Sequence, residues 1–429
     1  MRIVKLSTLI LAIIGVGIGL VAVKGNFLQA VGGPTPTPVT LEQSPPEIPM
    51  PTAPLVQGVL ATLPPVEAGK LIQPPTALSS RLLYLSYEDK ERLHYYIVDL
   101  QTGEKRELGP FPPPQDEGEF LIHASPTGER IVYSVYFDLF ALDPVVGIPE
   151  AREMGMGSIW LMNPDGSNKR QLVGSDELRY PVSAIWSPDG QEIAFLRLPD
   201  PRAVEQGKLK AEQAELWVMN ADGSEQRKVA DLPYLIEHNP IGGNPSMRWL
   251  LDDHIYIVTT VASKGDWLRI NPHTGEVTRL MEGVEPWEVE ISPDTRWIVG
   301  MSGVRVTALG RQPLHLPGIW TWDPTGARVA FVNLPFPYGD KSLEPGIWVM
   351  DLQEGKQNRL SAVDVTSTPC GQLSWSPDGK MLLCDSIEGL YVIWIDRDES
   401  RMVVQNPLAK EDAVGIKFVG WIPVSTRQP

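Results

Sequence analysis

A repeated unit of apolar segments and glycine-containing turns most constrains the fold of this chain. Each unit has an apolar segment ending in W-S-P-D-G, a second apolar segment, a third that reads I/L-W-V-M-N, an x-D-G-S turn, and a short basic segment before Leu. The clearest copies occupy residues 184–232 and 373–404. Short apolar runs separated by such turns predict strands, so each unit is expected to form a four-stranded antiparallel sheet.

Copies of this unit continue from about residue 82 to residue 423. Six copies are complete, and residues 82–109 supply only the second, third and fourth strands of a seventh. Residues 414–423, VGIKFVGWIP, read as a first strand that has no second strand after it. The sequence therefore predicts an all-β, seven-bladed β-propeller in which this C-terminal strand completes the N-terminal blade and leaves no exposed sheet edge. Six blades are the alternative, because the unit at residues 286–318 is the shortest and least regular.

The W-S-P-D-G turns set the expected strand register. Pro377 presets the backbone of a type I turn, and Gly379 supplies the left-handed residue that follows it. The expected hairpin loop then has three residues with a glycine bulge, and it places Ser376 opposite Lys380.

The two cysteines of the chain, Cys370 and Cys384, lie on either side of one of these turns. The same register places Cys370 opposite Ser386 and Cys384 opposite Gln372, so both thiols lie on one face of the sheet, offset diagonally. A disulfide between them would stabilise the fold by about 3 kcal/mol through loop closure. Two buried free thiols are the alternative.

The strings IWSPDGQEIAF, LWVMNADGS, IWLMNPDGS and LSWSPDGKMLL resemble the WD-like repeats of the TolB propeller family, which also occur in the propeller domains of prolyl-oligopeptidase-type peptidases. The resemblance covers residues 82–423 and specifies a fold, not a chemistry. It implies a platform in the cell envelope that binds other proteins, although nothing here matches the separate N-terminal domain of TolB. Repetition assigns structural roles to the motif residues: packing between blades for Trp186, Trp217, Trp348 and Trp375, and turn formation for Asp165 and Asp222.

The N-terminal region differs from the repeats. Residues 6–23, LSTLILAIIGVGIGLVAV, are uncharged and almost wholly apolar, and basic residues flank them on both sides. They predict one hydrophobic helix that spans the cell membrane once as a signal-anchor, with the remaining chain outside the cytoplasm. The alternative is a cleaved signal peptide and a secreted protein.

The expected domain organisation follows from these segments. Residues 1–24 are the signal-anchor, and residues 25–80 are a Pro-rich stalk, because proline favours extended polyproline II and prevents regular sheet. Residues 81–423 are the propeller, and residues 424–429 are a tail.

Charge and histidine spacing bear on partners and cofactors. Acidic side chains outnumber basic ones by 53 to 37, which gives a formal net charge of −16. Such a chain repels a phosphate backbone, so nucleic acid is not an expected partner. The 6 histidines are widely spread without ligand spacing, so we expect no metal or other cofactor.

Connection lengths distinguish the two faces of the predicted propeller. Turns between first and second strands are short, whereas long insertions at 136–158, 198–215 and 333–346 join second to third strands. Long loops on a rigid scaffold commonly carry binding sites. The connection at 231–246, which joins one unit to the next, lies on the same face. We expect a protein or peptide partner on this face, bound through Tyr136, Phe137, Phe140, Tyr234, Phe336 and Tyr338. The alternative is that the insertions pack on one another as a lid.

The expected function is therefore that of a membrane-tethered, non-catalytic binding or scaffolding module. The sequence lacks a G-x-S-x-G elbow, an H-E-x-x-H motif and a glycine-rich phosphate loop. The alternative is an enzyme, a polysaccharide lyase or glycosidase with its site at the central channel. His238 and His123 would be its first candidate residues.

Overall fold

The described part of the chain is almost entirely strands and turns. The computed structural model describes residues 77–86, 94–108, 119–136, 157–210, 213–233, 247–261, 264–284, 289–300, 305–307, 319–335, 339–367, 369–409 and 415–425. The predicted signal-anchor at residues 1–24 and the stalk up to residue 76 lie outside these ranges. Within them, α2 (Pro201–Glu205) is the only α-helix, and no helix is long and apolar enough to cross a membrane.

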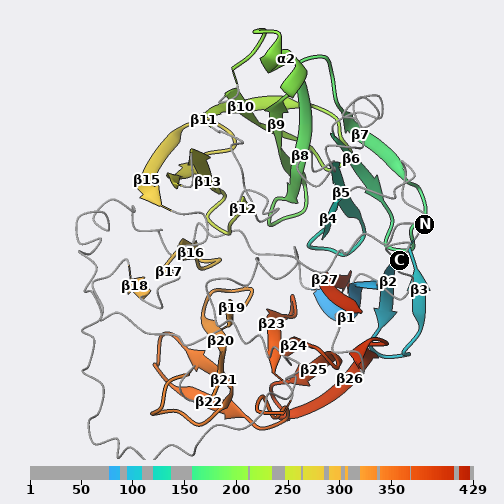
Figure 1. Ribbon diagram of the computed structural model, residues 1–429, viewed down its shortest axis with the longest axis vertical. Coiled ribbons are helices and arrows are strands. Elements are labelled where there is room, and N and C mark those ends of the chain that lie inside the picture. Colours follow the sequence, from blue (N-terminus) through green and yellow to red (C-terminus); the bar gives the residue numbers. More distant parts are fainter. Residues whose placement is uncertain are drawn as a thin grey trace, which may run out of the picture. The chain divides into compact units, whose positions relative to one another are not determined.

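The strands pair into antiparallel sheets, which are numbered here along the chain (Figure 1). The first sheet contains β27 (Ile416–Ser425), β1 (Ala77–Ser86), β2 (His94–Asp99) and β3 (Lys105–Glu107). The second contains β4 (Glu119–Ala124), β5 (Ile131–Tyr136), β6 (Gly157–Met162) and β7 (Arg170–Gly174). The third contains β8 (Arg179–Trp186), β9 (Glu192–Pro199), β10 (Gln213–Asn220) and β11 (Arg227–Pro233).

The remaining sheets follow the same order of pairing. The fourth contains β12 (Arg248–Trp249), β13 (Ile255–Val261), β14 (Lys264–Ile270) and β15 (Val277–Val284). The fifth has three described strands, β16 (Val289–Ile291), β17 (Trp297–Gly300) and β18 (Arg305–Thr307). The sixth contains β19 (Trp320–Trp322), β20 (Arg328–Asn333), β21 (Gly346–Asp351) and β22 (Gln357–Leu360). The seventh contains β23 (Cys370–Trp375), β24 (Met381–Ser386), β25 (Gly389–Trp394) and β26 (Glu399–Gln405).

The two ends of the described chain share the first sheet. β27 pairs with β1 antiparallel, with Leu82 opposite Trp421, which confirms the predicted closure by a C-terminal strand (Figure 1). The pairing continues to Ala77 opposite Ser425, beyond the expected propeller limits of 81–423. β1 and β27 satisfy each other's backbone hydrogen bonds along this whole length. The paired strands therefore extend beyond the apolar residues from which their ends were predicted.

Apolar clusters join successive sheets. Single clusters hold residues of the first and second sheets (Leu83, Tyr133), the second and third (Val132, Phe195), the third and fourth (Leu196, Ile257), the sixth and seventh (Ala330, Leu382), and the seventh and first (Leu383, Leu82). The Leu251 N–H donates to the Pro293 carbonyl at 3.2 Å between the fourth and fifth sheets, and Trp297 of the fifth packs against the cluster of the sixth. Each sheet thus contacts the next and the last contacts the first, which is consistent with a β-propeller.

The repeated turn is one residue longer than the sequence pattern indicated. Gly379 has φ +66°, which confirms its left-handed role. The Ser376 N–H, however, donates to the Met381 carbonyl at 2.9 Å, so the predicted pairing of Ser376 with Lys380 is wrong. The Ser376 hydroxyl accepts a hydrogen bond from the Met381 N–H at 2.9 Å. This side-chain bond stabilises the longer turn, in which Ser376 lies opposite Met381 instead of Lys380.

The register around the cysteines is shifted for the same reason. Cys384 lies opposite Leu373 and not opposite Gln372, which corrects the prediction. A β-bulge at Gly371 adds one residue to β23, so the predicted pairing of Cys370 with Ser386 is restored. The Cα atoms of Cys370 and Cys384 are 5.3 Å apart, and their sulfur atoms are bonded in this structure.

The motif residues have the structural roles expected of them. Trp186 Nε1 donates to the His123 carbonyl at 3.0 Å, and Trp375 Nε1 donates to the Thr321 carbonyl at 3.1 Å, in each case across to the preceding sheet. Trp217 and Trp348 are partly buried against clusters that neighbouring sheets share. Asp165 and Asp222 each accept hydrogen bonds from a serine two residues later and so stabilise the turns.

Candidate functional site

The aromatic residues predicted to bind a partner lie almost entirely outside the described residues. Phe137, Phe140, Tyr234, Phe336 and Tyr338 belong to connections that the structure does not describe. Tyr136 is the last residue of β5, and only its backbone is described. The partner site on these residues therefore stays a prediction.

Two of the long connections are nevertheless described in part, and one begins with α2. The helix follows β9, and its N-cap residue Asp200 is fully buried. The Asp200 carboxylate accepts hydrogen bonds from the Arg202 backbone N–H at 2.8 Å and from Arg202 Nε at 2.9 Å. Burial alone would raise the pKa of Asp200, but the hydrogen bonds from Arg202 lower it below its usual value. Ala203 is buried as well, so this part of the connection is anchored to the sheet.

The connection between β20 and β21 is organised by one buried amide. Asn333, the last residue of β20, is fully buried. Its Nδ2 donates to the carbonyls of Asp340 at 3.1 Å, Leu343 at 2.9 Å and Glu344 at 3.3 Å, and its Oδ1 accepts from the Asp340 N–H at 2.8 Å. Trp348 Nε1 adds a bond to the Glu344 carbonyl at 3.0 Å. These bonds order the described part of the connection before any partner arrives.

The sequence interpretation missed Asn333 and Asp200. It singled out aromatic residues in the long connections. The side chains that order the connections, Asn333 and Asp200, lie instead at the ends of β20 and β9. A signal was present, because Asn or Asp at a strand end favours hydrogen bonds to nearby backbone.

The first strands of several sheets approach one another. β4 contacts β27 and β8, and β8 also contacts β12. These strands carry exposed basic side chains, His123 on β4, Arg248 on β12 and Lys417 on β27. The exposure of these three side chains indicates that solvent reaches the first strands of these sheets.

His123, one of the two histidines suggested for an enzymatic site, lies among these strands. Its imidazole touches solvent, but the surrounding protein and then the Arg248 guanidinium lower its pKa to about 4. The ring is therefore neutral at pH 7 and can both donate and accept a hydrogen bond. His238, the other suggestion, lies outside the described residues.

A second group of titratable side chains is a buried structural cluster of the fourth sheet. Asp252 accepts hydrogen bonds from the Tyr256 hydroxyl at 2.9 Å and from Arg269 Nη2 at 3.0 Å, and His254 Nδ1 lies 3.4 Å from the same carboxylate oxygen. Burial would raise the pKa of Asp252, but the hydrogen bonds from its neighbours keep it lowered, and burial raises the pKa of Tyr256. Because Asp252 and Tyr256 are buried, the cluster ties the β12–β13 turn to β14.

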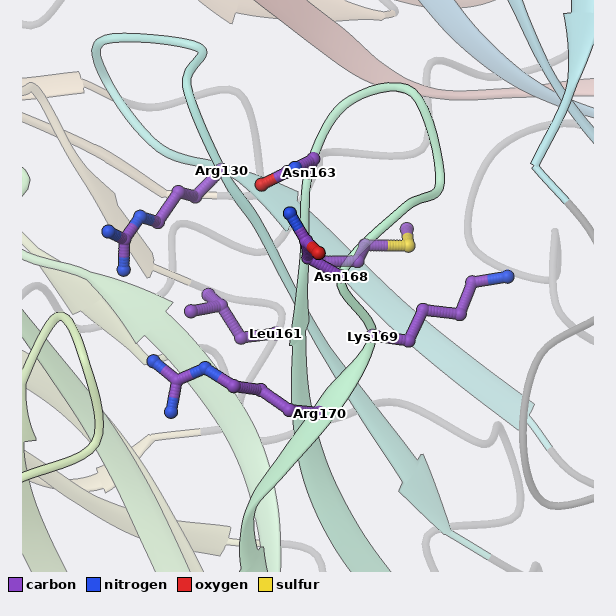
Figure 2. A pocket seen from close by; sticks show the side chains of 7 residues that line it. Arg130, Leu161, Asn163, Asn168, Lys169 and Arg170 are labelled. Atoms are coloured by element: carbon purple, nitrogen blue, oxygen red, sulfur yellow. The ribbon is translucent and has the colours of Figure 1, made fainter.

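A cavity of about 470 Å³ opens at the turn between β6 and β7 (Figure 2). Its lining consists of Arg130, Leu161, Met162, Asn163, Asn168, Lys169 and Arg170. Lys169 Nζ donates to the Leu108 carbonyl at 3.0 Å, and burial lowers its pKa. Arg170 Nη2 donates to the Asp222 carbonyl at 2.9 Å. The cavity is thus lined by basic and neutral side chains, without a carboxylate.

No group of three or more His, Cys, Asp or Glu side chains in the described ranges is placed to hold a metal ion. Residues that could bind a cofactor were not predicted from the sequence either.

No protein-family model matches the sequence, and no curated protein is similar to it. Solved structures with a similar chain course include an oligogalacturonate lyase in complex with manganese, at 12% identity over 73% of this chain and 86% of that one, with a TM-score of 0.45. TolB from Acinetobacter baumannii is 15% identical over 72% of this chain and 75% of its own, with a TM-score of 0.37. The β-propeller domain of the Trilobed protease from Pyrococcus furiosus is 11% identical over 78% of this chain and 95% of its own, with a TM-score of 0.46. The three names include enzymes as well as TolB, so they do not choose between an enzyme and a binding protein.

Proposed function

We propose that this protein is a TolB-type propeller of seven blades, tethered outside the cytoplasm, that binds a protein or peptide partner through its long connections. Each of the seven sheets is one blade in this proposal. The hydrophobic segment at residues 6–23 holds the chain to the membrane, and the Pro-rich stalk separates the propeller from it. The module acts as a scaffold and carries out no reaction.

The unequal length of the strand connections carries the proposal. β4 ends at Ala124 and β5 begins at Ile131, whereas β5 ends at Tyr136 and β6 begins only at Gly157. Connections that join second to third strands, or one sheet to the next, leave each sheet at the same end because successive strands are antiparallel. The long connections β5–β6, β9–β10, β11–β12 and β20–β21 belong to this set.

The fixed conformation of the β20–β21 connection supports a role in binding. Asn333 fixes the β20–β21 connection through its bonds to Asp340, Leu343 and Glu344. A loop that is ordered in advance loses less conformational entropy when a partner binds.

Photocrosslinking in cells tests this function. A photoreactive residue in place of the exposed Lys341, in the β20–β21 connection, should form discrete adducts with one partner. The matched control replaces the exposed Glu354 in the short β21–β22 turn and should form none. Equal adducts from both positions, or adducts from Glu354 alone, would refute binding through the long connections. Loss of the Lys341 adduct on substitution of Phe137, Tyr234 or Phe336 would extend the site to the aromatic residues.

The second candidate function, a polysaccharide lyase or glycosidase, is favoured by the exposed basic side chains of the inner strands. His123 and Arg248 lie on β4 and β12, and the Arg248 guanidinium helps burial to keep the His123 pKa low. Incubation with acidic and neutral polysaccharides, followed by detection of new reducing ends, tests this alternative. Turnover that is lost in His123→Gln would replace the binding proposal with an enzymatic one.

A further inference from the structure

The cavity at the β6–β7 turn holds two arginines where the next sheet holds an ion pair. In the second sheet, the Ser125 N–H donates to the Arg130 carbonyl, and in the third sheet the Ser187 N–H donates to the Glu192 carbonyl in the same way. Arg170 opposite Leu161 likewise corresponds to Arg227 opposite Val218. The side chains of Glu192 and Arg227 form an ion pair at 2.8 Å. The second sheet has Arg130 in place of that glutamate.

In other sheets, a cation at the position of Arg130 has a carboxylate partner. In the first sheet, Arg81 stands opposite Asp99, whose carboxylate lies 3.7 Å from its Nε. In the sixth sheet, Arg328 Nε lies 3.2 Å from Asp323. The residue of the second sheet that corresponds to Asp99 is Asn163, which is uncharged. Ser125 stands where the sixth sheet has Asp323. Arg130 therefore lacks the counterparts of both Asp99 and Asp323.

The two guanidinium groups share one side of the cavity. Figure 2 shows Arg130 and Arg170 extending in the same direction, with Leu161 between them, while Lys169 extends the other way. Among the described residues, neither arginine forms an ion pair with a carboxylate. The Asp222 carboxylate is the nearest to Arg170 in charge effect, since its pKa is lowered by hydrogen bonds from Ser224 and then also by Arg170. Arg170 uses one nitrogen for the Asp222 carbonyl, and its remaining donors are available to another acceptor. Two like charges in a chain of net charge −16 are not explained by a generally basic surface.

We propose that this cavity binds an acidic polypeptide segment, with one carboxylate held between Arg130 and Arg170. Each guanidinium presents a planar fork of N–H donors that matches a carboxylate. Leu161 offers an apolar floor for the methylene groups of a Glu side chain. Asn163 Nδ2 donates to Ser167 Oγ at 2.9 Å, and Asn163 offers its Oδ1 to a backbone N–H of the peptide. The acidic chain as a whole repels extended polyanions, which favours a ligand that brings few charges. This site lies at the short turns, so it is additional to the surface of the long connections.

Peptide binding to the purified full-length protein tests the proposal. The probe is a fluorescein-labelled peptide with a single Glu among Gly and Ser residues, and the control peptide has Gln in place of that Glu. Arg130→Glu should weaken binding of the Glu peptide roughly tenfold or more, because charged hydrogen bonds are lost and a repulsive charge replaces them. Lys380→Glu makes the same charge change at an exposed turn of the seventh sheet and should leave binding unchanged.

A stability measurement separates ligand binding from a structural role. Arg130→Glu should keep or raise the melting temperature, because it recreates the Glu192–Arg227 pair of the next sheet. A marked fall in melting temperature would contradict the proposal by showing that the fold requires Arg130. Equal binding of the Glu and Gln peptides, or of the Glu peptide to Arg130→Glu, would overturn it. Displacement of the peptide by inorganic phosphate at equal concentration would show a general anion site instead of a peptide site.

Discussion

Replacement of Asn333 by Ala should loosen one long connection without changing the sheets. The fully buried amide of Asn333 serves four backbone groups, three carbonyls and the Asp340 N–H. Loss of partners for buried backbone groups costs about 1–3 kcal/mol for each group left unsatisfied, but water can enter the loosened connection and satisfy some of them. We therefore expect the free energy of unfolding to fall by about 2–4 kcal/mol.

Urea denaturation measures this loss, which should appear as a lower midpoint with an unchanged slope. Hydrogen exchange of the Asp340 amide, which donates to Asn333 at 2.8 Å, should accelerate while the β20–β21 amides keep their protection. Asn358→Ala is the control, because Asn358 is exposed on β22. A loss in Asn333→Ala no larger than in the control would refute the role assigned to the amide. An unchanged crosslink from Lys341 in Asn333→Ala would show that partner binding does not need the ordered loop.

Three further substitutions test the disulfide, the contact of the β4–β5 turn with β27, and the protonation of His123. Replacing Cys370 and Cys384 by Ala should lower the free energy of unfolding by about 3 kcal/mol, because the bond closes a loop with a sequence separation of 14; denaturation of the wild type that is insensitive to reductant would contradict this. Gly128→Ala should destabilise far more than Gly103→Ala. Both glycines have positive φ, but only a Cβ at position 128 would clash with a backbone carbonyl, that of Pro423 on β27. Equal thermal unfolding of the two variants would argue against that contact. Because the pKa of His123 is lowered from 6.5 to about 4, the unfolded chain takes up this proton first as the pH falls. Stability should therefore decrease between those pH values in the wild type and less so in His123→Gln. Parallel pH profiles of the two proteins would contradict the lowered pKa of His123.

The fold followed from the sequence because its signals are local. A Pro-Asp-Gly turn and a period of two residues in the flanking strands predict hairpins wherever they recur. The closing strand could be predicted because two units are incomplete in a complementary way. Residues 82–109 have no first strand, and residues 414–423 are a first strand with no second after it. The pairing of β1 with β27 agrees with that reasoning.

The register errors show where local patterns stop being sufficient. The Ser376 hydroxyl bonds to the Met381 N–H and lengthens the turn by one residue, and the Gly371 bulge then reverses the shift. Neither effect changes which residues are apolar, so hydrophobic periodicity carries no trace of them.

The candidate sites were predicted less well than the fold. The sequence drew attention to aromatic residues in long connections, and these lie outside the described residues. Asn333 acts through backbone groups whose positions depend on the folded loop, so composition alone could not reveal it. The exchange of Glu192 for Arg130 between repeats was visible in the sequence. Its meaning required the strand register, which shows that these positions face Arg227 and Arg170.

Disulfide trapping tests whether β27 closes the ring by pairing with β1. Leu85 and Lys417 are opposite each other in the β1–β27 register, so cysteines at these positions lie within bonding reach. In a background with Cys370 and Cys384 replaced by Ala, mild oxidation should link the Leu85→Cys and Lys417→Cys positions. The competing pair, Lys417→Cys with Met402→Cys on β26, should stay unlinked. A crosslink to Met402 in place of Leu85 would show that the C-terminal strand pairs with its own preceding sheet, and the closed ring would be wrong.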